Sequence, residues 1–402
     1  MQNKIIVLLS LCLFTAGCMD LSEPYSPYNL HSFSVQAVYP EGFQAAAGAS
    51  VSIENISGSA SYRLTTDASG KVSTQITNGI YRVIISDLTR EFDIFNGSSD
   101  RVVVAGKDAS LQVPLFHSRK STLVIKEIYG GGCSKEPQEG TYQSDKYLII
   151  HNNHSKTLYL DSLCFGTLAP YNSTGVNHWV DKDGNLPDSF VPIAQAVWMF
   201  PGDGHRFPLA PGEDAVVCMF GAIDHSAQYP HSVNLDKPDY FVCYSPLFPN
   251  PSYHPAPGPH IRDDHYMDLV IKVGQANAYT FSVSSPAVTL FKAKGVSMSD
   301  YVAQAGSVQL TPGTSTDWVV TIPLDWVIDA VEVFDGRSSN NLKRFLPSLD
   351  AGYVFQSEPF KGHTLMRYVN ESASEEAGYQ ILVDTNNSGN DFYERKTQSL
   401  HE

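Results

Sequence analysis

The sequence lacks the short motifs that identify many soluble enzymes and zinc modules. Its six cysteines form no CxxC or CxxH pair, which gives no support to a thioredoxin-like or zinc-ribbon fold. A GxSxG elbow, a Walker A loop, a GxGxxG turn and an HExxH helix are also absent. The familiar serine hydrolase, nucleotide-binding and zinc protease classes are therefore disfavoured.

Positive charge is scarce in this chain. Lys and Arg total 27 against 42 for Asp and Glu, so the formal net charge is -15. That sign argues against nucleic acid as a partner and against adhesion to anionic lipid headgroups. Only 17% of residues are charged, whereas Gly (29), Pro (24) and Tyr (21) are abundant, a composition typical of a turn-rich β protein.

A long apolar run is missing at the N-terminus. Residues 5–14 give about ten apolar positions, about half of what a membrane-spanning helix needs. Residues 15–18 read Thr-Ala-Gly-Cys, which resembles the bacterial lipobox apart from Thr15, where Leu is usual. The resemblance implies that residues 1–17 are a signal peptide, that Cys18 carries lipid and that residues 18–30 form a tether. An ordinary secretory signal is the alternative.

Residues 31–118 alternate apolar and polar positions in runs of five to eight, separated by turn residues such as those at 67–70 and 78–79. This pattern predicts an antiparallel β-sandwich of about seven strands. The order GASVSIEN, TTDASG and GIYRVIISD resembles carboxypeptidase-regulatory-like (prealbumin-like) modules. Such modules are usually spacers or binding domains, and the resemblance supplies no catalytic residue.

Residues 121–396 contain KEIYGGG, DKYLIIHN, LAPGEDAVVC, VIDAVEVFDG and ILVDTNNSGNDF in this order, which resembles the lamin-tail domain. The segments stand farther apart than in that domain, so we predict large insertions at about 165–205 and 222–300. No Gly-Lys pair opening a helical pattern follows Gly130–Gly132 to hold a phosphate, so we expect a loop there. The predicted fold is all-β, with two tandem immunoglobulin-like β-sandwiches.

The tandem modules behind a lipobox resemble an uncharacterised family of surface lipoproteins in Gram-negative bacteria. The resemblance implies an outer-membrane lipoprotein that binds or scaffolds, exposed at the surface or facing the periplasm, with a nutrient-uptake receptor as a partner. A metal or haem capture protein is the alternative, and a glycan-active enzyme is the third hypothesis. We expect no catalytic residue and, unless the alternative holds, no cofactor.

Two segments carry candidate metal ligands. One contains His254, His260 and His265 with Asp263 and Asp264, whose imidazoles and carboxylates suit a transition metal or haem iron. A solvated, proline-rich loop with incidental histidines is the competing interpretation.

The second segment has Asp384, Asn386 and Ser388 at positions 1, 3 and 5 of a calcium-loop pattern. Position 12 is Arg395 rather than the expected Glu, and a turn explains the same residues.

Four aromatic residues are candidates for contact with a ligand. Trp179, Trp198, Tyr253 and Tyr266 lie in the predicted insertions, where they would either contact a ligand or pack the insertions onto the sandwich.

If Cys18 carries lipid, four cysteines of the mature chain remain, and they allow three disulfide pairings. They are Cys133, Cys164, Cys218 and Cys243.

Overall fold

The computed structural model describes residues 29–56 and 58–401. Cys18, the predicted lipidation site, and the predicted signal peptide lie outside the described residues, as does all but the end of the predicted tether. Within the described ranges, no helix has the length and apolar character that a membrane crossing needs. The predicted all-β class is confirmed, since sheets pack on one another and the helices are short.

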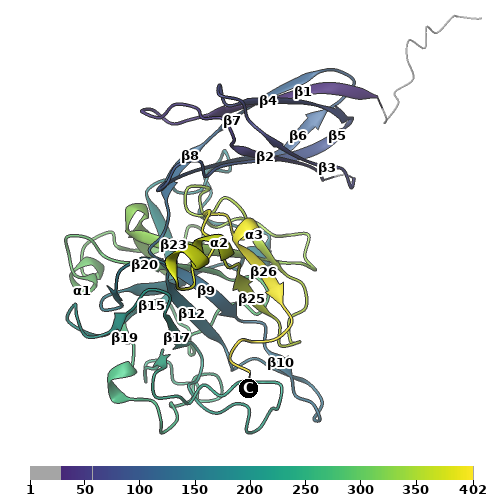
Figure 1. Cartoon of the computed structure of the whole chain (residues 1–402). Helices are drawn as coiled ribbons and strands as arrows, with labels where there is room; N and C mark the ends of the chain where they lie inside the picture. The colour runs from purple at the N-terminus through teal and green to yellow at the C-terminus, as the bar shows by residue number, and fades with distance from the viewer. Residues whose placement is uncertain (1–28, 57, 402) are drawn as a thin grey trace, which may run out of the picture.

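The first module, residues 30–119, is a two-layered β structure (Figure 1). One sheet has the order β4-β1-β7 and the other β3-β2-β5-β6-β8. The strands are β1 (Leu30–Val38), β2 (Ser50–Asn55), β3 (Ser61–Thr65), β4 (Lys71–Thr77), β5 (Gly79–Asp87), β6 (Asp93–Val104), β7 (Ala109–Pro114) and β8 (Phe116–Arg119).

Alternation along these strands builds the first core. In β1, the side chains of Phe33, Val35 and Ala37 are buried while their neighbours are not, as a strand with one buried face requires. One pairing departs from the antiparallel prediction, because β7 runs parallel to β1. Alternation specifies which face is buried but not the direction of the neighbouring strand.

The second module, residues 123–401, places a larger sandwich below the first (Figure 1). A six-stranded sheet has the order β18-β17-β12-β9-β25-β26, and an eight-stranded sheet has the order β21-β22-β15-β14-β20-β23-β24, with β19 paired to β15. The principal strands are β9 (Leu123–Tyr129), β12 (Tyr147–Asn152), β14 (Cys164–Leu168), β15 (Phe190–Met199), β17 (Asp214–Cys218), β18 (Phe241–Val242), β19 (Asp268–Lys272), β20 (Ala287–Phe291), β21 (Val308–Leu310), β22 (Trp318–Pro323), β23 (Val327–Asp335), β24 (Val354–Gln356), β25 (Thr364–Arg367) and β26 (Phe392–Arg395).

Short elements complete the second module. Two small antiparallel pairs are β10 (Cys133–Ser134) with β11 (Thr141–Tyr142), and β13 (Leu158–Tyr159) with β16 (Pro208–Leu209). The helices are α1 (Met298–Val302), α2 (Glu371–Ala377) and α3 (Ser388–Asp391), and the 3-10 turns are η1 (Asn172–Thr174), η2 (Asp263–His265) and η3 (Leu324–Trp326).

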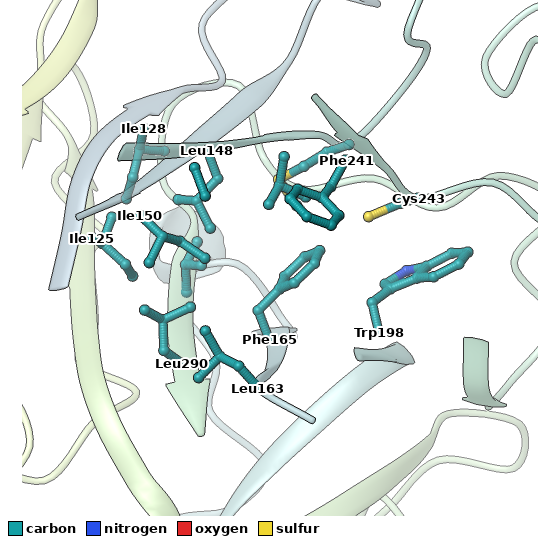
Figure 2. Close-up of a cluster of buried hydrophobic side chains, with 14 of the residues drawn as sticks. Ile125, Ile128, Leu148, Ile150, Leu163, Phe165, Trp198, Phe241, Cys243 and Leu290 are labelled. Carbon is teal, nitrogen blue, oxygen red and sulfur yellow. The ribbon is translucent and has the colours of Figure 1, made fainter. Parts of the chain in front are cut away.

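The main core of the second module fills the space between its two sheets. Side chains from β9 and β12, such as Ile125 and Leu148, meet Phe165, Trp198 and Leu290 from the opposite sheet (Figure 2). Burial of these side chains supplies the principal stabilisation of the sandwich.

Both outer faces of this sandwich are covered as well. Tyr147 and Ile149 point away from the main core into a second cluster that includes Val233, Leu235 and Ile261 from the long segment after β17. All six residues of β12 are therefore buried, which is why its sequence shows no alternation. The insertions thus form part of the packing.

The two modules meet at a polar joint, formed by Asn96, Ser118 and Ser121 against residues 384–386. Asn96 donates to the carbonyl oxygen of Thr385 at 2.6 Å, and Asn386 donates to Ser118 Oγ at 2.8 Å. The backbone N–H of Ser121 donates to Asp384 Oδ2 at 2.5 Å. The loop that resembled a calcium site therefore lies against the first module.

The four described cysteines are free thiols. The register of β17 and β18 explains this for the nearest pair, because Cys218 lies opposite Val242 rather than Cys243. Cys218 consequently packs in the outer cluster and Cys243 in the main core, on opposite faces of the sheet.

Candidate ligand-binding groove

Two adjoining hollows in the second module form one groove. The first has a volume of about 580 Å³ and the second about 390 Å³, and they share Tyr171, Gln195 and Ala276. Most of its lining residues belong to the predicted insertions at about 165–205 and 222–300. The first hollow is lined by residues 143, 146, 171, 195, 220, 253, 276–278 and 280–283, and the second by 169–171, 174, 194, 195, 273–276, 317 and 318.

Gln195 organises the middle of the groove. It lies in β15 where the pairing with β14 is irregular, and its φ of 64° is unusual for a residue with a side chain. Its amide donates to the carbonyl oxygen of Thr280 at 2.8 Å and accepts from the Thr280 N–H at 3.1 Å. These two hydrogen bonds hold the segment after Ala276 in place, and this segment forms one wall of the groove.

Aromatic rings line the first hollow. Phe220 and Tyr253 make an edge-on contact with ring centres 6.4 Å apart, and 46% of the surface of Tyr253 is exposed. Phe281 packs against Gly130, where an added Cβ would lie 2.3 Å from its ring. The first glycine of the predicted loop is therefore required for close approach, while Gly132 adopts the positive φ of 71°.

Lys146 lies in the floor of the first hollow, with 1% of its surface exposed. Its Nζ donates to the carbonyl oxygen of Phe281 at 2.6 Å and lies 5.2 Å and 5.1 Å from the ring centres of Phe220 and Phe281. Burial lowers the pKa of this amine to about 7. A small change in its surroundings can therefore change its charge near neutral pH.

The far end of the groove is formed by Asp317 and Trp318 at the start of β22. Trp318 has 44% of its surface exposed, although its neighbours in the strand are buried. Exposed aromatic residues thus stand at both ends of the groove, Tyr253 at one and Trp318 at the other.

The aromatic residues predicted from sequence have different positions. Tyr253 lines the groove, whereas Trp198 is fully buried in the main core beside Phe165 and Cys243 (Figure 2). Trp198 thus differs from the expected ligand contact, because both faces of β15 are covered. Trp179 packs edge-on against Phe190, and Tyr266 packs against Tyr244.

The predicted histidine ligands have separate partners. His254 Nε2 accepts from the Ser245 N–H at 3.1 Å, and burial lowers the pKa of His254 to about 4. His260 Nδ1 lies 2.8 Å from Asp236. His265 contacts Asp264 at 2.8 Å and stacks on Phe241, while Asp263 opens the same 3-10 turn. Across residues 29–56 and 58–401, no group of three or more His, Cys, Asp or Glu side chains is arranged to hold a metal ion.

The predicted calcium ligands also have intramolecular partners. Asp384 lies 3.6 Å from the Arg367 guanidinium, Asn386 donates to Ser118, and Ser388 Oγ donates to Asp350 at 2.5 Å. These contacts account for their polar side chains within the fold.

Sequence reasoning missed Lys146, Gln195 and Trp318 as groove residues. Lys146 directly precedes the apolar run Tyr147–Ile150, and a lysine beside a fully buried strand was the available signal. The irregular pairing that exposes Gln195 has no sequence signature, and Trp318 resembled an ordinary strand residue.

Comparison with known proteins locates a family match in the second module. Residues 210–399 match a protein family of unknown function, DUF4876. The match covers slightly less than half of the chain. Phe220, Tyr253 and Trp318 lie within the matched part, whereas Lys146 and Gln195 precede it.

A solved structure extends the similarity to most of the chain. It is the crystal structure, at 2.50 Å resolution, of a DUF4876 family protein from Bacteroides thetaiotaomicron VPI-5482. The two chains are 26% identical with a TM-score of 0.58, and the alignment covers 90% of this chain and 94% of the other. Among curated proteins, none matches the chain.

Proposed function

We propose that this protein is a lipid-anchored binding protein of the bacterial outer membrane and that it holds its ligand in the groove of the second module. The observation that carries the proposal is the continuous groove with the exposed rings of Tyr253 and Trp318 at its ends. Exposed aromatic rings on a fixed framework are suited to contact with a ligand. Each hollow also lies within the size range of small-molecule sites, about 300 to 1,000 Å³.

The lining of the groove supports binding rather than glycan hydrolysis. Asp317 is the one carboxylate among the described lining residues, whereas most glycoside hydrolases use a pair of carboxylates. The lining is otherwise rich in amides and aromatic rings, which bind a ligand without reacting with it.

The anchor and the partner are part of the same proposal. The lipobox resemblance at residues 15–18 supports lipidation of Cys18 and attachment to the outer membrane, with an outer-membrane receptor as the partner. Affinity purification of the tagged lipoprotein from solubilised outer membranes should recover a receptor in stoichiometric amount. Recovery of the lipoprotein alone would count against this partner.

The groove is tested by ligand capture with the mature full-length chain. The protein is incubated with a small-molecule extract of the producing bacteria's growth medium, washed, and examined by mass spectrometry after denaturation. A Tyr253→Ala, Trp318→Ala double variant should lose the retained compounds, whereas Phe92→Ala, which removes an exposed ring in the first module, should keep them. Equal retention by all three proteins, or no retention by the unmodified chain, would contradict the proposal.

Metal or haem capture through the segment from His254 to His265 is the second hypothesis. Of its imidazole atoms, His254 Nδ1 is buried without a hydrogen-bond partner among the described residues. Elemental analysis of the purified protein should find stoichiometric metal if this hypothesis holds, and His260→Ala should reduce it. The binding proposal predicts neither result.

A further inference from the structure

Lys146 is a buried cation without a direct ion pair. Among the described residues, no carboxylate oxygen lies within 4.0 Å of its amine. Its nearest acceptors are the Phe281 carbonyl oxygen at 2.6 Å and Thr280 Oγ1 at 3.5 Å. An ammonium group has three donors, so this environment satisfies the charged form incompletely.

Burial lowers the pKa of Lys146, and the charge of the adjacent Asp145 opposes this effect without offsetting it. Asp145 precedes Lys146 in the chain, but its Oδ2 accepts from Tyr129 at 2.9 Å and from Ser232 at 2.6 Å. Successive side chains of an extended segment point to opposite sides, which separates Asp145 from the groove.

The first hollow lacks the negative charge that prevails in the rest of the chain. The chain has a net charge of -15, yet the described lining of the first hollow contains no Asp or Glu, and Lys146 is its one charged residue. Asp317 lies at the opposite end, in the second hollow. The Lys146 end is therefore the place in the groove where an anion would meet no repulsive carboxylate.

We infer that the ligand of the proposed groove carries a carboxylate that pairs with Lys146, attached to a ring that packs against Phe220, Tyr253 and Phe281. The inference rests on the proposed function and deepens it by naming the chemical class of the ligand. A buried charge is costly when it is unpaired, and a bound carboxylate would supply both the countercharge and the missing acceptor. The rings beside Lys146 supply the apolar contact for the body of the ligand.

The test compares two probes that differ in charge. Naphthoate and naphthamide have the same ring system, but only the first is a carboxylate. Titration calorimetry at about pH 6 should give about tenfold or tighter binding of naphthoate, as expected for a charge-assisted contact. Lys146→Met should remove that preference while retaining naphthamide binding, and Lys107→Met, which removes an exposed lysine of the first module, should leave it unchanged.

The outcomes of this test distinguish the carboxylate inference from the proposal that the groove is a binding site. Equal binding of both probes to the unmodified protein would overturn the carboxylate inference while leaving the groove as a binding site. A preference that persists in Lys146→Met would also overturn the inference. Failure of both probes to bind would contradict the inference, whereas the ligand-capture experiment tests the groove independently.

A second readout uses the unmodified protein, so it does not depend on the folding of a variant. The preference for naphthoate should decline as pH rises through about 7, because Lys146 then loses its proton. The other titratable groups around the first hollow are Asp145, Tyr171, Tyr253 and His254. Burial raises the pKa of Tyr171 and lowers that of His254 to about 4, so neither changes charge in this window. A preference that is constant from about pH 6 to pH 9 would contradict the inference.

Discussion

Two lysines of the second module, the buried Lys146 in the groove and the half-buried Lys343, have opposite surroundings. Lys343 donates to Glu332 at 2.5 Å and to the carbonyl oxygens of Asp350 and Gly352, and the nearby carboxylates raise its pKa despite burial. Lys146 has a carbonyl and a hydroxyl as neighbours, and burial lowers its pKa. Lys343 has carboxylate partners within the fold, whereas Lys146 has no ion pair and is the lysine that we propose pairs with a ligand.

Arg367 is a buried cation beside the joint, and it has several carboxylate partners. Its guanidinium lies 2.7 Å from Asp329, 3.3 Å from Asp391 and 3.6 Å from Asp384, and all four side chains are nearly or completely buried. Burial, together with the charge of Asp384, raises the pKa values of Asp329 and Asp391. The joint therefore has more buried negative charge than one guanidinium can balance.

The largest expected effect is that of Arg367→Met, which removes the countercharge of this cluster. We expect a loss of about 3 to 5 kcal/mol in the free energy of unfolding, measured by urea denaturation, because the buried carboxylates lose their partner. The loss should be smaller in mild acid, where the carboxyl groups are protonated, and larger as pH rises. A loss below about 1 kcal/mol at every pH would contradict the role assigned to Arg367.

Lys146→Met should change stability in the opposite direction. Removing an unpaired buried cation should raise the free energy of unfolding by about 1 to 4 kcal/mol. The pKa of Lys146 is about 7 in the folded protein, against the ordinary lysine value of 10.5 for the unfolded chain, so below pH 7 the folded protein bears the full cost of the charge. The gain should therefore be greatest at or below pH 7 and should shrink as pH rises toward about 10.

Comparing variant and unmodified protein at each pH cancels the titration of the Arg367 cluster, which is common to both. A Lys146→Met variant that is less stable than the unmodified protein at about pH 6 would show that the amine is structurally required. Such a result would mean that Lys146, like Lys343, supports the fold.

Asn96→Ala tests the joint between the modules without changing its charge. Asn96 is 1% exposed, donates to the Thr385 carbonyl oxygen and accepts from Ser86. Loss of both bonds leaves buried groups unsatisfied, so we expect a decrease of about 1 to 3 kcal/mol in unfolding free energy. Thermal denaturation measures it, with the exposed Asn185→Ala as a control that should change little. An unchanged midpoint would indicate that the joint is not part of the cooperative unit.

Trp318→Ala should have the smallest effect on stability, about 1 kcal/mol, because 44% of the surface of Trp318 is already exposed. Its effect should instead appear in ligand capture. A large loss of stability, measured by urea denaturation, would identify Trp318 as a packing residue and leave one end of the groove without an aromatic contact.

The strands and turns of the first module could be predicted because they depend on the local pattern of apolar and turn residues. Alternation in residues 31–118 predicted the strands of the first module, and the turn at residues 67–70 is present, with Asp67 accepting from the Ser69 and Lys71 N–H groups. The parallel pairing of β1 with β7 was missed, because strand direction depends on how the chain crosses between sheets.

The candidate site depended on contacts that are remote in sequence. Tyr253 and Trp198 were both candidate ligand contacts, but Tyr253 lines the groove whereas Trp198 lies in the core, since aromatic content does not distinguish a buried strand from a loop. Lys146 could not be assigned because the surroundings of its amine are formed by segments 74 and more residues away, such as Phe220 and Phe281. The loop at Asp384 resembled a calcium site because turns and calcium loops use the same residues.

The central claim is that Lys146 lies in a ligand site and has no direct ion pair until the ligand binds. The most direct test is NMR titration of the Lys146 amine in the full-length mature protein labelled with ¹³C-lysine, with Lys146→Met used to assign the signal. We predict a pKa of about 7 for the free protein and a clear increase when saturating naphthoate is present. A pKa near the ordinary lysine value in the free protein, or one that naphthoate leaves unchanged, would contradict the account.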